Sequence, residues 1–117
     1  QELQARVDIA NQNHADLFVS IHADAFEDRS VGGTTTYFFP KTGHDAELAS
    51  HIQHKLSVSL GLANRGHLSN DFFVLNHTDM PAALVEVAFL SNIAEEKALK
   101  TKSFRKKAAQ GIYDGIA

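Results

Sequence analysis

His22 and Glu86 have side chains that can bind a metal or transfer a proton. His22 follows an apolar run, and Glu86 lies inside another. The segment 17–21 is mostly apolar and rich in β-branched and aromatic side chains, which predicts a buried strand that ends at His22. In open α/β sheets, ligand-binding groups gather outside the carboxyl ends of strands. His22 is therefore placed to ligate a metal or carry a proton, unless it simply makes one hydrogen bond to the following loop.

Glu86 lies inside the segment 81–90, in which eight of the ten residues are apolar. A carboxylate in such a setting is costly to bury unless a metal, a cation or several donors accompany it. Burial would also raise its pKa toward the range of a general base. The alternative is an edge strand from which Glu86 points into water.

Length and composition fit one globular domain, because 117 residues suffice for a hydrophobic core. The net charge of -3 offers no basic surface for nucleic acid, and no run is long and apolar enough to span a membrane. The absence of cysteine excludes disulfides and thiolate metal sites. Histidine, aspartate and glutamate are therefore the strong metal ligands available.

Apolar spacing and turn residues predict alternating helices and strands, which is typical of an α/β sheet of mostly parallel strands. Gly61 is expected to cap the end of one helix, and Asn92 and Glu95 have the N-cap and N3 spacing of another. The expected elements are a helix over 1–14, strands over 17–22 and 34–39, a helix over 44–60, a loop over 61–71, a strand over 72–75, a strand within 81–90, and helices over 93–100 and 103–116.

Three histidines, His44, His51 and His54, lie on the helix predicted over 44–60. Of these, His51 and His54 alone have the spacing of a helical metal-binding pair, so a solvated face is the simpler interpretation. The basic run within 102–107 is interpreted in the same way.

Four segments carry a resemblance that runs in order through the chain: ADLFVSIHAD (15–24), GTTTYF (33–38), MPAALVEVAFLSN (80–92) and AAQGIYDGI (108–116). With these segments the chain resembles the zinc-dependent N-acetylmuramoyl-L-alanine amidases of the amidase-3 group, which are cell-wall hydrolases. The histidine and glutamate motifs together are a more specific signal than either alone. The resemblance implies that residues 1–117 form a single amidase catalytic domain.

The resemblance also implies a single twisted sheet flanked by helices, with Zn²⁺ at its carboxyl edge. His22 matches the second of the two histidines that hold the metal together with a glutamate, and Glu86 matches the catalytic glutamate. The implied reaction is hydrolysis of the amide bond between N-acetylmuramic acid and L-alanine of the peptidoglycan stem peptide, by zinc-activated water with Glu86 as general base. Ser20 and Asp24 flank His22 and are expected to orient it.

The chain departs from the family pattern because it lacks the glycine-rich motif that carries the first histidine. His22 is then one ligand of three, and we expect the other two upstream of residue 1, in a domain that is incomplete at its amino end. His14, His67 or His77 could in principle replace them, although no spacing favours these residues.

The same resemblance predicts peptidoglycan as the partner and the bacterial cell wall as the location, with extracellular, periplasmic, spore and phage-encoded enzymes all consistent with it. A wall-binding module is expected elsewhere in the parent protein. Arg65 and His67, in the loop expected over 61–71, either contact carboxylates of the stem peptide or simply face water. The rival interpretations are a non-catalytic peptidoglycan-binding or regulatory module, and a different α/β metal hydrolase that uses the same His22 and Glu86.

Overall fold

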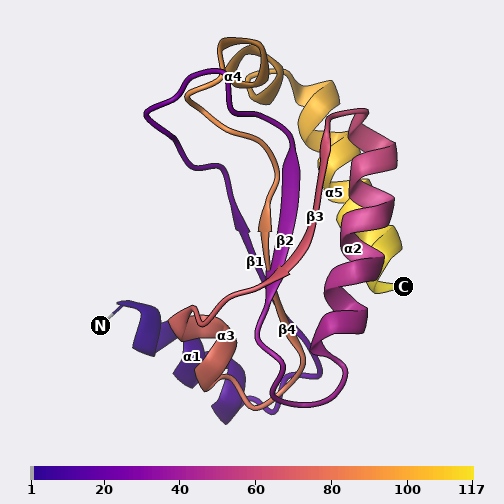
Figure 1. Cartoon of the computed structure of the whole chain (residues 1–117). Helices are drawn as coiled ribbons and strands as arrows, with labels where there is room; N and C mark the ends of the chain where they lie inside the picture. The colour runs from indigo at the N-terminus through magenta and orange to yellow at the C-terminus, as the bar shows by residue number, and fades with distance from the viewer. Residues whose placement is uncertain (1) are drawn as a thin grey trace.

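The computed structural model describes residues 2–117, which form helices on both sides of one sheet (Figure 1). The elements, in order, are α1 (Glu2–Gln12), β1 (Phe18–His22), β2 (Thr34–Phe38), α2 (Asp45–Leu60), β3 (Asn64–Ser69), α3 (Phe73–His77), β4 (Ala82–Glu86), α4 (Ile93–Leu99) and α5 (Lys102–Ile116).

The sheet has the strand order β1-β4-β2-β3, in which β1 pairs with β4 and β2 pairs with β3 in parallel. The central pair, β2 and β4, is antiparallel. The predicted α/β class with a mostly parallel sheet is thus confirmed, and the sheet is mixed. Because β4 lies between β1 and β2, the alternative that placed Glu86 on an edge strand is wrong.

Alternate residues of β4 face opposite layers of helices, as expected for a strand. Ala83 and Val85 pack in the cluster formed with α2 and α5, which lie side by side along one face of the sheet (Figure 1). Ala82 and Leu84 pack in the cluster on the other face, where α1 and α3 lie. Glu86 follows Leu84 in this alternation, so its side chain faces the layer of α1 and α3.

Helices α2 and α5 approach each other closely because α5 carries glycine at the contact. A Cβ atom on Gly111 would lie 2.9 Å from the Leu56 Cα, and one on Gly115 would collide with the Ile52 backbone. Larger residues at these two positions would therefore force α5 away from α2.

Two expected elements are wrong. The segment expected as a loop over 61–71 contains the edge strand β3, whose side chains are mostly exposed and polar, so hydrophobic alternation does not reveal it. Its Gly66 has φ 87°, at an irregular register against β2. The segment expected as a strand over 72–75 contributes to the one-turn helix α3, because Val74 and Leu75 become buried against the sheet. Five residues are too few for helical periodicity to appear.

The predicted helix ends agree better with the structure. Gly61 caps α2 in the left-handed conformation, and the Asn92 side chain accepts a hydrogen bond from the Glu95 amide at the start of α4. The helix expected over 1–14 spans Glu2–Gln12, and residue 1 lies outside the described residues.

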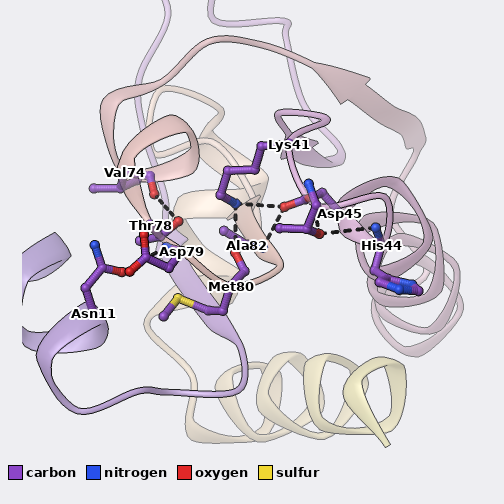
Figure 2. A network of polar contacts seen from close by, with 10 residues as sticks. Asn11, Lys41, His44, Asp45, Val74, Thr78, Asp79, Met80 and Ala82 are labelled. Atoms are coloured by element: carbon purple, nitrogen blue, oxygen red, sulfur yellow. Dashed lines mark hydrogen bonds and ion pairs between the residues drawn. The ribbon is translucent and has the colours of Figure 1, made fainter.

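A buried carboxylate, Asp45, ties the start of α2 to the amino end of β4 (Figure 2). Its Oδ1 accepts from Lys41 Nζ at 2.8 Å and from the Ala82 amide at 3.0 Å, while Oδ2 accepts from the amide and hydroxyl of Thr42 at 2.8 and 2.6 Å. Burial alone would raise the pKa of Asp45, but these four donors together lower it to about 2. Asp45 is therefore a fully partnered structural charge.

The predicted solvated faces are confirmed, since His51 and His54 are exposed on α2, His44 is exposed at its N-cap, and the basic residues within 102–107 are exposed on α5. Within residues 2–117, no helix combines the length and apolar character needed to cross a membrane.

Candidate active site

The two residues singled out in the sequence meet at the carboxyl ends of adjacent strands. His22 is the last residue of β1 and is directly paired with Glu86, the last residue of β4. The segments that follow stay together, because the Val87 amide donates to the His22 carbonyl at 3.0 Å and the Leu90 amide donates to the Asp24 carbonyl at 2.8 Å. The parallel pairing of β1 and β4 therefore creates the site.

Asp24 completes a cluster of three potential metal ligands. One ligand atom from each of His22, Asp24 and Glu86 can be chosen so that all three lie within 4.8 Å of one another. Asp24 is exposed, His22 is half-buried, and Glu86 is only 5% exposed. The cluster thus has one side open to solvent and one side closed by the sheet.

The environment of Glu86 disfavours its charged form. Burial is the main cause, and the neighbouring Asp24 carboxyl group adds to it by hydrogen bonding and by like charge. The Asp24 amide donates to Glu86 Oε1 at 3.1 Å and opposes this shift. The net result raises the pKa of Glu86 to about 8. A carboxyl group in this range can both accept and return a proton near neutral pH.

Ser20 and Asp24 contact different members of the cluster. The Ser20 hydroxyl and His22 Nε2 share a hydrogen bond of 2.7 Å, and both side chains lie on the same face of β1. The hydrogen bond of Asp24 to the cluster runs instead from its amide to Glu86. Ser20 is therefore positioned to act on His22, whereas Asp24 is positioned to act on Glu86.

Two hollows meet at Asp24, Glu86 and Phe72. The first, which we call the metal-side hollow, has a volume of about 240 Å³ and extends over Ser20 and His22 toward α1. The second, which we call the aromatic hollow, has a volume of about 410 Å³. Its remaining walls come from Ala25, Phe26, Tyr37 and Phe89. A substrate whose reacting bond lies at Glu86 can thus extend to both sides.

Sequence reasoning missed the contribution of Glu95 to this architecture. The side chain was expected only at the N3 position of a helix start. It is buried, and its oxygens accept from the Gly33 amide at 2.6 Å and from the Phe89 amide at 2.8 Å. Glu95 therefore fixes the backbone that follows β4 to the start of β2, beside the aromatic hollow. The glutamate three residues after an N-cap was a signal for a cap, but not for these longer contacts.

The other histidines raised as replacement ligands do not join the cluster. His14 is exposed just after α1, and His77 stacks on Phe73 with ring centroids 4.1 Å apart. The Thr36 hydroxyl donates to Gln53 of α2, so the Thr36 side chain faces the layer of α2 and α5. His67 is the partner of Thr36 in β3 and faces the same layer, which is the opposite side of the sheet from Glu86.

Comparison with known proteins identifies the class of hydrolase to which this architecture corresponds. The model of the N-acetylmuramoyl-L-alanine amidase family (Amidase_3) matches residues 1–117. The chain belongs to this family.

Two relatives place the chain more closely within the family. It is 41% identical over 115 residues to N-acetylmuramoyl-L-alanine amidase LytC of Bacillus subtilis, covering 97% of the chain and 23% of LytC. Among solved structures, the catalytic domain of the amidase CwlV from Bacillus (Paenibacillus) polymyxa var. colistinus superposes with a TM-score of 0.93 at 38% identity, covering 99% of the chain and 64% of that catalytic-domain chain.

An amidase from Clostridium difficile 630 has a TM-score of 0.93 at 33% identity, and it is covered to 62%. The chain thus spans less than two thirds of the relatives that it matches, while nearly all of its own length is matched.

Proposed function

We propose that this chain forms part of a zinc-dependent amidase that cleaves the bond between N-acetylmuramic acid and L-alanine in peptidoglycan, with His22 as a metal ligand and Glu86 as general base. The observation that carries the proposal is the direct pairing of His22 with Glu86, beside Asp24, at the carboxyl ends of β1 and β4. Membership of the amidase family supplies the substrate class.

The cluster fits a divalent cation by its chemistry. It offers the His22 imidazole nitrogen, a donor that Zn²⁺ accepts, and it places the carboxyl groups of Asp24 and Glu86 close to a cation held there. It also brings two carboxyl groups together, a costly arrangement that a cation would relieve. When bound, zinc would lower the pKa of a water molecule to about 7 and polarise the substrate carbonyl.

Glu86 would act as the proton carrier of the reaction. Its buried carboxylate takes the proton of the attacking water and then gives it to the nitrogen of the leaving L-alanine. In the metal-free site, burial and Asp24 raise the pKa of Glu86, so it is a stronger base there than an exposed glutamate, and this supports the assignment. Asp24 would therefore assist through Glu86, in addition to the orienting role expected from the sequence.

Ser20 would position the His22 ring. Since His22 Nε2 is bonded to Ser20, Nδ1 is the nitrogen left free to ligate when Nε2 carries the proton. Such outer partners fix both the tautomer and the orientation of a ligating histidine.

The remaining zinc ligands would come from residues outside these 117. One histidine does not complete a zinc site, and His14, His67 and His77 lie away from the cluster. The solved relatives contain further chain beyond the part that is matched, which leaves room for such ligands.

The same proposal places the enzyme at the bacterial cell wall, outside the cytoplasm, and puts a wall-binding module elsewhere in the parent protein. The short coverage of LytC, at 23%, leaves room for such a module. A binding module without catalysis is not favoured. In such a module, burial of Glu86 beside Asp24 would lower the stability of the fold with no catalytic or metal-binding role to maintain it.

Product analysis tests this function. The full-length protein is incubated with purified peptidoglycan, and new free amino groups of L-alanine are measured beside new reducing sugar ends. We expect new L-alanine amino groups without new reducing ends, loss of the activity with a zinc chelator and recovery with Zn²⁺. New reducing ends, or release that persists after chelation, would contradict the proposal.

A further inference from the structure

The aromatic hollow has no role in the chemistry described so far, although it shares Glu86 and Asp24 with the site. Its aromatic walls are held in pairs. The rings of Phe26 and Phe89 have centroids 5.0 Å apart, and those of Tyr37 and Phe72 meet edge to face at 5.3 Å. These rings offer apolar area beside the reacting groups.

A cation lies at the side of this hollow. The Arg65 guanidinium stands over the Phe89 ring, 5.6 Å from its centroid, and its other contact is a long 3.5 Å hydrogen bond to the Gly32 carbonyl. Within residues 2–117, Arg65 forms no ion pair with a carboxylate. Arg65 is exposed, so a guanidinium placed over an aromatic ring keeps outer N–H groups available for a planar anion such as a carboxylate.

The support beneath Arg65 is rigid. Glu95 accepts from the Phe89 amide at 2.8 Å and from the Gly33 amide at 2.6 Å, so the backbone that carries the Phe89 ring and the backbone beside Arg65 are both held in place. A binding group on such a support loses little freedom when it captures a ligand.

The sheet sets the distance between this cation and the reacting bond. Glu86 is paired with Thr35 of β2, and β3, which carries Arg65, is the next strand. Two strand spacings amount to about 10 Å between the backbones of β4 and β3. The Arg65 side chain reaches back over Phe89, which lines the same hollow as Glu86, so its guanidinium lies within about that distance of the reacting bond. An extended peptide spans that distance in about three residues. An anion that reaches Arg65 from an amide at Glu86 therefore belongs to the first few residues of a peptide.

We propose that the aromatic hollow binds the peptide side of the substrate and that Arg65 pairs with a carboxylate on the second or third residue of the stem peptide. This proposal rests on the proposed function. The peptide is favoured over the saccharide because a muramic acid whose lactyl carboxyl is tied up in the scissile amide presents no carboxylate to Arg65. His67, also on β3, faces the opposite side of the sheet and takes no part.

The test compares two synthetic muramyl peptides that differ only in whether the second-residue carboxyl group is free or amidated; a matched pair probes the third residue. The full-length, zinc-loaded enzyme and its Arg65→Gln variant are assayed on each pair. We expect wild type to favour a free carboxylate, and Arg65→Gln to reduce that preference by about tenfold, mainly through KM. High salt should weaken the preference of the wild type.

Three further variants serve as controls. Arg65→Lys should keep part of the preference, because it keeps the charge but loses the planar fork. His67→Gln, on the other face of β3, and Lys106→Gln, which removes an exposed charge from α5, should leave the preference unchanged.

The outcomes separate the two proposals. If Arg65→Gln lowers hydrolysis of both members of each substrate pair equally, the hollow holds an uncharged part of the substrate, such as the saccharide, and the assignment is overturned. An unchanged preference in Arg65→Gln would also overturn it. Absence of hydrolysis of every substrate by the wild type would instead remove the proposed function, and this inference with it.

Discussion

A buried carboxylate lies at each end of strand β4, and the pKa values of the two are shifted in opposite directions. One is Asp45 of α2, and the other is Glu86 of β4 itself. At its amino end, Asp45 accepts four hydrogen bonds, including one from Lys41, and its pKa falls to about 2 (Figure 2). At its carboxyl end, Glu86 accepts one hydrogen bond from the Asp24 amide and lies beside another carboxyl group, and its pKa rises to about 8. Burial is the same in kind at both ends, so the partners decide the difference.

This contrast distinguishes a structural carboxylate from a reactive one. Asp45 is held in its charged form, because every nearby donor stabilises that form. Glu86 lies where its charged form is short of partners, which is how catalytic acids and bases are commonly prepared. The most direct way to examine the contrast is to make the same isosteric change, carboxylate to carboxamide, at both ends.

The largest effect on stability is expected at Asp45. Asp45→Asn should lower the free energy of unfolding by about 3 kcal/mol, because it leaves Lys41 partly buried without its charged partner. Chemical denaturation measures this change. Asp114→Asn, at an exposed site on α5, is the matched control and should change stability by less than about 0.5 kcal/mol. A decrease of similar size in the free energy of unfolding of both variants would contradict the structural role of the Asp45 charge.

The next effect concerns the Ser20 contact with His22. Ser20→Ala should weaken zinc binding by the full-length protein about 10- to 100-fold, because the ring loses the partner that fixes its orientation. Competition with a chromogenic chelator measures the affinity. Ser69→Ala, on the exposed edge strand β3, should leave the affinity unchanged. Equal affinities in the Ser20 variant and the wild type would remove the positioning role.

The contribution of Asp45 to the stability of the fold should depend on pH. Its folded pKa of about 2 lies below the ordinary value of 3.8, so its contribution is complete above about pH 4 and is lost as the pH falls toward 2. We expect this loss to amount to about 1–2 kcal/mol. Denaturation of wild type and Asp45→Asn across this window should show converging curves. A difference in stability between wild type and Asp45→Asn that stays constant down to pH 2 would contradict the lowered pKa of Asp45.

The last effect has the opposite dependence on pH and arises at Glu86. In zinc-free protein, a folded pKa of about 8 against an ordinary 4.5 means that protonation stabilises the fold, fully below pH 4.5 and progressively less up to pH 8. Glu86→Gln imitates the protonated form and should exceed wild type in stability at pH 8.5 by about as much as Asp45 loses in acid or more, with no gain at pH 4. A variant less stable than wild type at pH 8.5 would contradict this.

Much of this architecture could be predicted from local patterns in the sequence. The apolar runs before His22 and around Glu86 indicated the two strands that meet at the site, and the alternation of elements indicated a mostly parallel sheet, but the direct pairing of these two strands was not predicted. The caps at Gly61 and Asn92 also followed from local chemistry. These features depend on neighbours within a few residues, which sequence patterns record directly.

The missed features depend on contacts between distant segments. The edge strand β3 is exposed and polar, so its only signature is pairing with β2. Helix α3 forms because Val74 and Leu75 find a buried place beside the sheet, against their strand propensity. The bonds from Glu95 to Gly33 and Phe89 join three segments that no periodicity relates.

The central claim is that Glu86 carries the proton while His22 holds the metal. It is tested most directly by measuring zinc content and muropeptide hydrolysis together in full-length Glu86→Gln. We expect zinc bound as in the wild type and hydrolysis lowered about 10²- to 10⁴-fold, because only the base is removed. Hydrolysis within severalfold of wild type would show that Glu86 is not the base, and loss of zinc together with activity would show that it is a ligand.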